Sequence, residues 1–281
     1  MPDINDVKRF WDATPLFVGE GSCEPGTKEW FLEHERIIET DCIPDATQID
    51  FLMGGISMNA HILDVGCGPG QWVRRFLRRG NSYVSACDLT PRAVELTKKS
   101  LDIFGLTTMG QIVQGNAEDL PFDDASFDHV NCQGVIHHTP NTERCVVEFH
   151  RVLKPNGTLC FSVYYRNVFL RHPTLLRLMQ VTAGFGMGLK GRGRERLVKE
   201  ASTAEDLVRR YDGLDNPIGK VYTREEMLAL LCCDGRQLFK SLHVERHFFP
   251  ARALPFRIPK ALHKFLSRHA GLLIAVQAVK I

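Results

Sequence analysis

The amino-acid sequence predicts an α/β protein whose core is one mostly parallel sheet with helices on both faces. Between residues 60 and 163, short apolar runs alternate with amphipathic helical patterns, which is the rhythm of strand–helix–strand units. A glycine-rich turn directly follows the first of these runs, and two further apolar runs lie near the end of the sequence. The 281 residues are 44% hydrophobic and 24% charged, which is a globular composition, long enough for a core that holds a ligand.

Five apolar runs are predicted as parallel strands, separated by helices. The strands are expected at residues 61–65, 83–88, 111–115, 127–133 and 158–165. The helices are expected at residues 71–79, 91–104 and 142–153. Pro91 stands in the first helical turn, where its missing N–H is not needed, and the KPNG segment at 154–157 ends the last of these helices. Two closing strands, at 243–249 and 272–280, bring the sheet to seven strands.

The segments on either side of this core differ from it in composition. We divide the chain into an N-terminal helical lid (1–59), a ligand-binding core (60–165), a basic helical cap insert (166–212) and a C-terminal part of the core (213–281). Within these segments helices are expected over 28–40, 221–231 and 255–268. The second begins with a capping box of Thr223 and Glu226, and the third is basic and amphipathic.

The glycine-rich turn, DVGCGPG at 64–70, predicts a ligand site at the end of the first strand. Glycines let the backbone approach a ligand that a Cβ would exclude, and the spacing G-x-G-x-G differs from the G-x-G-x-x-G of dinucleotide-binding proteins. Asp88 ends the second strand, where a carboxylate can accept hydrogen bonds from both hydroxyls of a ribose; the alternative is an acid that caps the helix at Pro91. Asn116 follows the third strand, where an amide can meet the edge of an adenine.

These segments, in the order DVGCGPG, ACDLT, GNAEDLPF, FDHVNCQGVIHHTP and EFHRVLKPNG, resemble the class I S-adenosylmethionine-dependent methyltransferases. The resemblance covers residues 60–163 closely and 217–281 loosely, and it implies a Rossmann-like sheet that ends in an antiparallel hairpin. It implies S-adenosyl-L-methionine as cofactor, with Gly66 and Gly68 at its methionine part, Asp64 shaping the turn and Asp88 on the ribose. It also places Leu89 on the adenine, Asn116 and the Ala117 N–H at the adenine edge, and Gln133 at the methionine end. Many relatives carry Asp where this chain has Asn116.

His137 and His138 lie where the fourth strand meets its loop, beside the expected methyl position. An imidazole suits a general base if the acceptor must lose a proton, although one or both rings could instead be structural. Three aromatic side chains are candidates for a lid that excludes water, with ordinary packing as the alternative: Trp11, Phe17 and Trp30. No Asp-Pro-Pro-Tyr or Pro-Cys sequence follows the fourth strand, which counts against DNA as the substrate, and we identify no carboxylate cluster for a metal.

The expected function is therefore methyl transfer to an oxygen or nitrogen atom of a small organic metabolite by in-line displacement. Methylation of carbon, on a small molecule or an isoprenoid- or quinone-type lipid, is the first alternative. RNA is a second alternative because of the basic stretch Lys190, Arg192, Arg194, Arg196 and Lys199, although a net charge of +2 counts against it. The same charges suit a peripheral membrane contact or a solvated loop. The N-terminus lacks an apolar signal region and the nine cysteines are scattered, so we expect a cytoplasmic protein without a membrane span.

Overall fold

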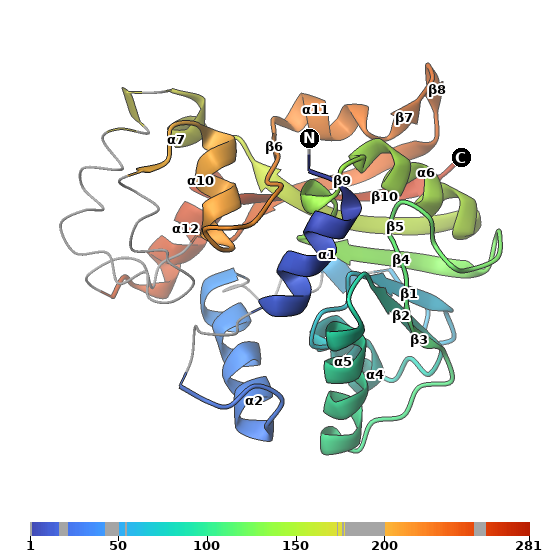
Figure 1. The fold of residues 1–281 in the computed structure, drawn as a ribbon. Helices are drawn as coiled ribbons and strands as arrows, with labels where there is room; N and C mark the ends of the chain where they lie inside the picture. Colours follow the sequence, from blue (N-terminus) through green and yellow to red (C-terminus); the bar gives the residue numbers. More distant parts are fainter. Residues whose placement is uncertain are drawn as a thin grey trace.

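The computed structural model describes residues 2–16, 22–42, 51–53, 55–172, 174–175, 177, 200–249 and 257–281. Its centre is a sheet of strand order β3-β2-β1-β4-β5-β10-β9 (Figure 1). These strands are β1 (Ile62–Val65), β2 (Val84–Asp88), β3 (Ile112–Gln114), β4 (Phe127–Gln133), β5 (Leu153–Tyr165), β9 (Phe239–His247) and β10 (Leu273–Lys280). The first five are parallel, and β10 is antiparallel to both β5 and β9. The predicted sheet and its closing antiparallel pair are confirmed.

Alternate residues of the central strands face opposite layers of helices. Leu63 and Val65 of β1 pack in the same apolar cluster as Phe149 of α6 (Thr142–Val152) and Met227 of α11 (Arg224–Ala229). Ile62 of β1 points the other way, into a cluster with α4 (Gln71–Arg79). On this side α5 (Pro91–Phe104) also packs on β2 and β3. Burial on both faces explains why these strands read as continuous apolar runs.

Several boundaries differ from the sequence prediction. β5 begins at Leu153, because the KPNG segment forms an irregularity within the strand: the register with β4 shifts there and Asn156 has φ +60°. Residues 221–222, expected as the start of a helix, form the short strand β6 (Val221–Tyr222), which pairs with the end of β5. The predicted capping box of Thr223 and Glu226 is confirmed at the start of α11. A separate two-stranded ribbon, which the sequence did not predict, joins β7 (Cys232–Cys233) and β8 (Arg236–Gln237).

Within the core, β4 is followed by the 3₁₀ turn η2 (Ile136–His138). The flanking segments contain the helices α1 (Ile4–Ala13), α2 (Lys28–Ile37), the π-helical turn η1 (Ile38–Cys42), α7 (Val168–Arg171), α10 (Ala204–Tyr211) and α12 (Lys260–Ala270). α1 starts with a capping box between Asp3 and Asp6 and crosses in front of the sheet (Figure 1). Within the described residues no helix is both long and apolar enough to cross a membrane.

Candidate functional site

The carboxyl ends of β1, β2 and β4 meet where the strand order reverses, between β1 and β4. Ligands of open α/β sheets bind at such a point. Two adjoining cavities lie there, with volumes of about 120 and 150 Å³, so the site has two chambers of similar size. We call them the first and the second cavity. They share the glycine turn, and both are lined by Gly66, Gly68, Gln133 and Gly134.

The glycine turn between β1 and α4 needs glycine for two different reasons. Gly66 has φ +73°, and a Cβ there would lie 2.3 Å from Cγ2 of Val135, so the position is both left-handed and closed by a neighbour. Gly68 has φ +50°, but a Cβ there would meet no atom within 4 Å. The backbone of Gly68 therefore faces open space in the cavities, which is what close approach of a ligand requires.

Asp88, at the end of β2, joins the glycine turn to the start of α5. Its Oδ2 accepts a hydrogen bond from the Gly68 N–H at 3.0 Å, and its Oδ1 accepts from the N–H and the hydroxyl of Thr90 at 3.0 and 3.1 Å. Burial raises the pKa of the Asp88 carboxyl, and these three hydrogen bonds oppose that rise. The cap of α5 is Thr90, whose side chain accepts from the Ala93 N–H. Asp88 therefore supports the cap residue without being the cap.

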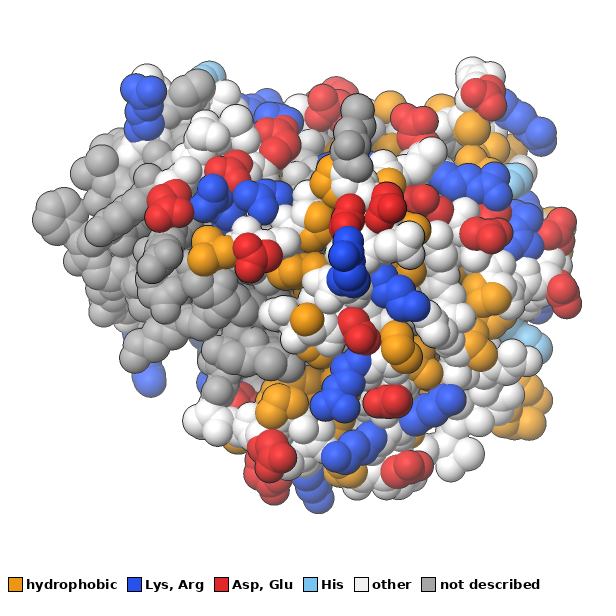
Figure 2. Space-filling model, viewed as in Figure 1, with side chains coloured by type: hydrophobic (Ala, Val, Ile, Leu, Met, Phe, Trp, Pro, Cys, Tyr) orange, Lys and Arg blue, Asp and Glu red, His pale blue; other side chains and the backbone are white. Residues whose placement is uncertain are grey.

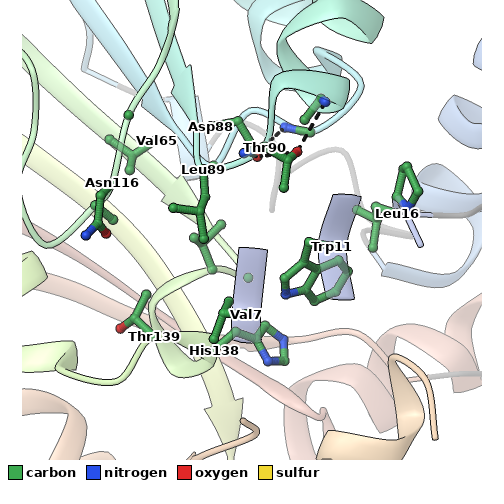
Figure 3. A pocket seen from close by; sticks show the side chains of 18 of the residues that line it. Val7, Trp11, Leu16, Val65, Asp88, Leu89, Thr90, Asn116, His138 and Thr139 are labelled. Atoms are coloured by element: carbon green, nitrogen blue, oxygen red, sulfur yellow. Dashed lines mark hydrogen bonds between the residues drawn. The ribbon is translucent and has the colours of Figure 1, made fainter. Parts of the chain in front are cut away.

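The first cavity extends from Asp88 to the helix α1. Figure 3 shows Asp88 and Leu89 on one side of it and Trp11 with His138 on the other. Asn116 and Ala117 line it as well, and Oδ1 of Asn116 accepts a hydrogen bond from the Glu118 N–H at 3.0 Å. The cavity thus gathers every residue that the family resemblance assigned to adenosine.

A buried polar chain supports the glycine turn from below. Asn131 Nδ2 donates to Asp64 Oδ1 at 2.7 Å, and Gln133 Nε2 donates to Asn131 Oδ1 at 3.0 Å. Asp64 is 1% exposed, its Oδ2 has no hydrogen-bond partner, and burial raises the pKa of its carboxyl to about 7. Asp64 lines neither cavity, which agrees with a role in shaping the turn, whereas Gln133 lines both.

His138 is held at both ring nitrogens. Nδ1 lies 2.7 Å from the Ile218 carbonyl oxygen, which can only accept, so this nitrogen carries a proton. Nε2 lies 3.2 Å from Oδ2 of Asp212, and the same oxygen accepts a hydrogen bond from the Tyr164 hydroxyl at 2.7 Å. The ring centroids of Trp11 and His138 lie 5.2 Å apart in an edge-to-face arrangement. His138 therefore links the wall of the first cavity to residues of the second.

His137 lies in the second cavity, in a different environment. It is 1% exposed and its ring centroid lies 4.4 Å from that of Tyr164. Burial, with the nearby positive charge of Lys220 and the His138 ring, holds the pKa of His137 well below its ordinary value, so the imidazole is neutral. Its Nδ1 has no hydrogen-bond partner. The structure thus separates the two histidines that the sequence could not distinguish.

The second cavity is mostly aromatic and apolar. The largest side chains that line it are Trp72, Tyr164, Tyr211 and Phe248. His247 also lines it, and burial lowers the pKa of this histidine to about 4, so it too is neutral. Within the described residues, no lysine or arginine lines this cavity and no cluster of side chains suits a metal ion.

The three aromatic residues predicted as a lid differ in their position relative to the cavities. Trp11 and Val7 of α1 line the first cavity. Trp30 instead packs in an apolar cluster with Phe31 and Ile37 against Leu96 of α5, and it lines neither cavity. Phe17 lies outside the described residues, as does the basic stretch of the cap insert.

The sequence did not reveal two supports of the site. Arg74 of α4 is fully buried; its Nε lies 2.8 Å from Glu35 of α2 and its Nη1 donates to the Pro69 carbonyl at 2.7 Å, which anchors the glycine turn. Asp212 is 74 positions after its partner His138. Tyr164 could have been found from the sequence, because it lies at the carboxyl end of a predicted parallel strand.

Residues 63–161 match a protein family described as a methyltransferase domain. Together with the strand order and the glycine turn, this match identifies residues 63–161 as a methyltransferase domain of the class I S-adenosylmethionine-dependent type.

The relatives show how far the likeness extends. An uncharacterized methyltransferase of Bacillus subtilis is 34% identical over 107 residues, which is 37% of this chain and 40% of that protein. A ubiquinone/menaquinone biosynthesis C-methyltransferase of Bartonella bacilliformis is 34% identical over 104 residues, 36% of this chain and 40% of the relative. A glycine/sarcosine/dimethylglycine N-methyltransferase of Actinopolyspora halophila is 32% identical over 107 residues, 38% of this chain and 19% of the relative. The matched region thus spans less than half the length of these curated relatives.

Solved structures share the fold over more of the chain. A methyltransferase of Thermotoga maritima, described as a possible histamine N-methyltransferase, has a TM-score of 0.57 and 18% identity, with 98% of this chain and 100% of that chain covered. A methyltransferase of Methanosarcina mazei has a TM-score of 0.54 and 22% identity, with 82% and 97% covered. At these identities the likeness establishes the sheet and its helices.

Proposed function

We propose that this protein transfers a methyl group from S-adenosylmethionine to an oxygen or nitrogen atom of a small organic acceptor. The observation that carries the proposal is the pair of cavities that meet at the glycine turn. The first cavity is lined by the residues suited to adenosine, and the second cavity adjoins it at Gln133, which lines both. Such an arrangement holds two reactants in contact, and positioning alone supplies much of the rate enhancement of a bimolecular transfer, with effective molarities of about 10⁵–10⁸ M.

The residues present fit this cofactor. The open backbone at Gly68 leaves space that a side chain would fill, and Asp88 offers carboxylate oxygens to the ribose hydroxyls. Gln133, which we assign to the methionine end, lines the first cavity and has a buried Oε1 without a hydrogen-bond partner. When bound, the cofactor supplies a methyl group that its sulfonium already activates. The protein then has to orient the acceptor, exclude water and take up a proton.

Helix α1 is suited to exclude water from the first cavity. Ile4, Val7 and Trp11 lie on one side of this helix and line the cavity, while Asp6 and Arg9 on its other side are paired with each other. Trp11 also contacts His138, so the helix is seated against the loop after β4. We assign to α1 the role of a lid over bound adenosine, and to Trp30 the packing of α2 on α5.

His137 is the better base of the two histidines. Both nitrogens of His138 are engaged by Ile218 and Asp212, so this ring has no free lone pair for an acceptor. His137 is neutral and lies in the second cavity. A base is needed only when the acceptor loses a proton in the reaction, as a hydroxyl group does.

Methylation of a carbon atom is the second candidate. The apolar lining of the second cavity favours it, since Trp72, Phe248 and Leu273 suit a prenyl or quinone ring as well as any other apolar acceptor. The Bartonella relative, by its name, is a C-methyltransferase of quinone biosynthesis. On the face drawn in Figure 2, basic and acidic side chains of the described residues are interspersed, and the net charge of +2 also counts against RNA.

The proposal is tested with S-adenosylmethionine labelled with ¹³C in its methyl group. The protein is incubated with 4-hydroxybenzyl alcohol, tyramine, a simple quinol or RNA, and the chemical shift of the transferred carbon identifies the atom methylated. We expect a methyl signal on oxygen or nitrogen, lost in Asp88→Ala and kept in the exposed control Asp102→Ala. A signal on carbon or in the RNA fraction, or no transfer to any acceptor, contradicts the proposal.

A further inference from the structure

We propose that the second cavity binds an uncharged acceptor that carries a hydroxyl group on an aromatic ring, and that His137 takes the proton of this hydroxyl. This inference rests on the proposed function and narrows its substrate class. It follows from the charges, the shape and the unpaired polar atoms of the cavity wall.

Among the described residues that line the second cavity, none offers a free counter-charge to a charged acceptor: lysine and arginine are absent, and the carboxylate is engaged. Its only described carboxylate is Asp212, at 3.2 Å from Nε2 of His138. Oδ2 of Asp212 is thus already engaged, since it also accepts a hydrogen bond from the Tyr164 hydroxyl at 2.7 Å. His137 and His247 add no charge, because burial keeps both rings neutral.

A charged acceptor would therefore lose its hydration without gaining a counter-ion, and such burial is strongly unfavourable. The shape of the wall favours a flat ring instead. The rings of His137 and Tyr164 lie 4.4 Å apart at 51°, and those of Tyr211 and Phe248 lie 5.9 Å apart at 68°. With Trp72 these side chains present aromatic faces and edges to the cavity, against which an aromatic ring packs well.

Besides Oε1 of Gln133, which lies between the two cavities, the wall holds further buried polar atoms without a hydrogen-bond partner. One is Nδ1 of His137, and another is Nε2 of Gln71, the first residue of α4, which is 4% exposed. The amide nitrogen of Gln71 is a donor, and the neutral imidazole has one nitrogen with a lone pair. A native protein rarely leaves such groups unpaired, so they indicate a ligand that both donates and accepts. A hydroxyl group does both.

An oxygen lone pair of the hydroxyl forms the bond to the methyl carbon, and the carbon–sulfur bond breaks with its electron pair moving to sulfur. The hydroxyl proton passes to the free nitrogen of His137. The products are a methyl ether, S-adenosylhomocysteine and a protonated imidazole, which returns its proton to water after the product leaves.

The binding test uses protein loaded with S-adenosylhomocysteine and three ring probes that differ mainly in charge. These are 4-hydroxybenzyl alcohol (neutral), 4-hydroxybenzoate (anionic) and tyramine (cationic), titrated calorimetrically at pH 7.5. We expect the neutral probe to bind at least about tenfold more tightly than either charged one. Equal or tighter binding of a charged probe, or no binding of any probe, overturns the inference. If S-adenosylhomocysteine itself fails to bind, the proposed function fails instead.

The role of His137 is tested by the pH dependence of methyl transfer to 4-hydroxybenzyl alcohol. In His137→Gln we expect the rate to fall about a hundredfold near pH 7 and to recover as the pH approaches about 10, where a phenol ionises without a base. His129→Gln is the matched control, because His129 is equally buried but lines neither cavity. Retained affinity for S-adenosylhomocysteine shows that each variant is folded. A fall that no rise in pH reverses gives His137 a structural role only.

Discussion

The carboxyl group of Asp64 allows a quantitative test of how the glycine turn is supported. The side chain is 1% exposed, accepts one hydrogen bond from Asn131 and has no partner at Oδ2. Burial raises the pKa of this carboxyl from 3.8 to about 7. In the unfolded chain the group ionises at its ordinary pKa, so between these two values the folded protein holds a proton that the unfolded chain releases. The contribution of Asp64 to the free energy of unfolding therefore falls as the pH rises from about 4 to about 7, and it does not fall further above that value.

The substitution Asp64→Asn removes this loss. An amide keeps an oxygen for Asn131 and has nearly the same shape. With about 1.4 kcal/mol for each pH unit, the titration of Asp64 lowers the free energy of unfolding by about 2 kcal/mol at pH 5.5 and about 4 kcal/mol at pH 8.5. The difference between the variant and the wild type should thus increase by about 2 kcal/mol between these pH values. Effects of the substitution that do not depend on pH cancel in this comparison.

Urea denaturation without cofactor, followed by circular dichroism at both pH values, measures this difference. The control is Asp128→Asn. Asp128 accepts hydrogen bonds from the His61 N–H and from Lys154, and although partial burial raises the pKa of its carboxyl, these contacts lower it overall. Above its ordinary pKa the carboxyl of Asp128 is fully ionised in the folded and in the unfolded protein, so Asp128→Asn should be destabilised equally at both pH values. If Asp64→Asn gives the same difference at pH 5.5 and 8.5, or a smaller one at pH 8.5, the proposed cost of burying this carboxylate is refuted.

Two further predictions concern the glycine turn and the lid. Gly66→Ala should lower the free energy of unfolding by about 2–5 kcal/mol, because φ is +73° and the new Cβ would collide with Val135. Gly105→Ala is the control: its φ is +62° and its Cβ would meet open space, so it should lower the free energy of unfolding by only about 1–2 kcal/mol. Equal losses of the two variants in urea denaturation would contradict this prediction. Trp11→Ala should weaken the binding of S-adenosylhomocysteine about tenfold in calorimetry and hardly change the free energy of unfolding without ligand. Trp30→Ala should instead lower the free energy of unfolding by about 3–5 kcal/mol, because Trp30 is a core residue. If a folded Trp30→Ala loses more affinity than Trp11→Ala, the roles that we assign to the two rings are reversed.

The strands and the cofactor side of the site were predictable because their signals are local. The apolar runs of the sheet, Pro91 at a helix start and the acid at the end of β2 each depend on a few neighbouring residues. The edge of the sheet then brings Gly68, Asp88 and Asn116 together without further information, since parallel strands share a carboxyl end.

The acceptor side depends on contacts between distant segments, and the sequence could not give them. The partners of His138, at Asp212 and Ile218, come from a different segment of the chain, so nothing near His138 shows that its nitrogens are engaged. Likewise, the aromatic residues of the N-terminal segment look alike in the sequence. Only the folded structure shows that Trp11 lines the first cavity whereas Trp30 packs against Leu96.

The central claim is that the first cavity binds the adenosyl cofactor through Asp88. It is tested most directly by calorimetric titration of the protein with S-adenosylhomocysteine and with NAD, for the wild type and Asp88→Ala. The account predicts binding of S-adenosylhomocysteine only. It also predicts a loss of about a hundredfold or more in the variant, since hydrogen bonds to a charged group contribute about 1.5–3 kcal/mol each. Binding of NAD with similar affinity, or unchanged affinity for S-adenosylhomocysteine in Asp88→Ala, would contradict it.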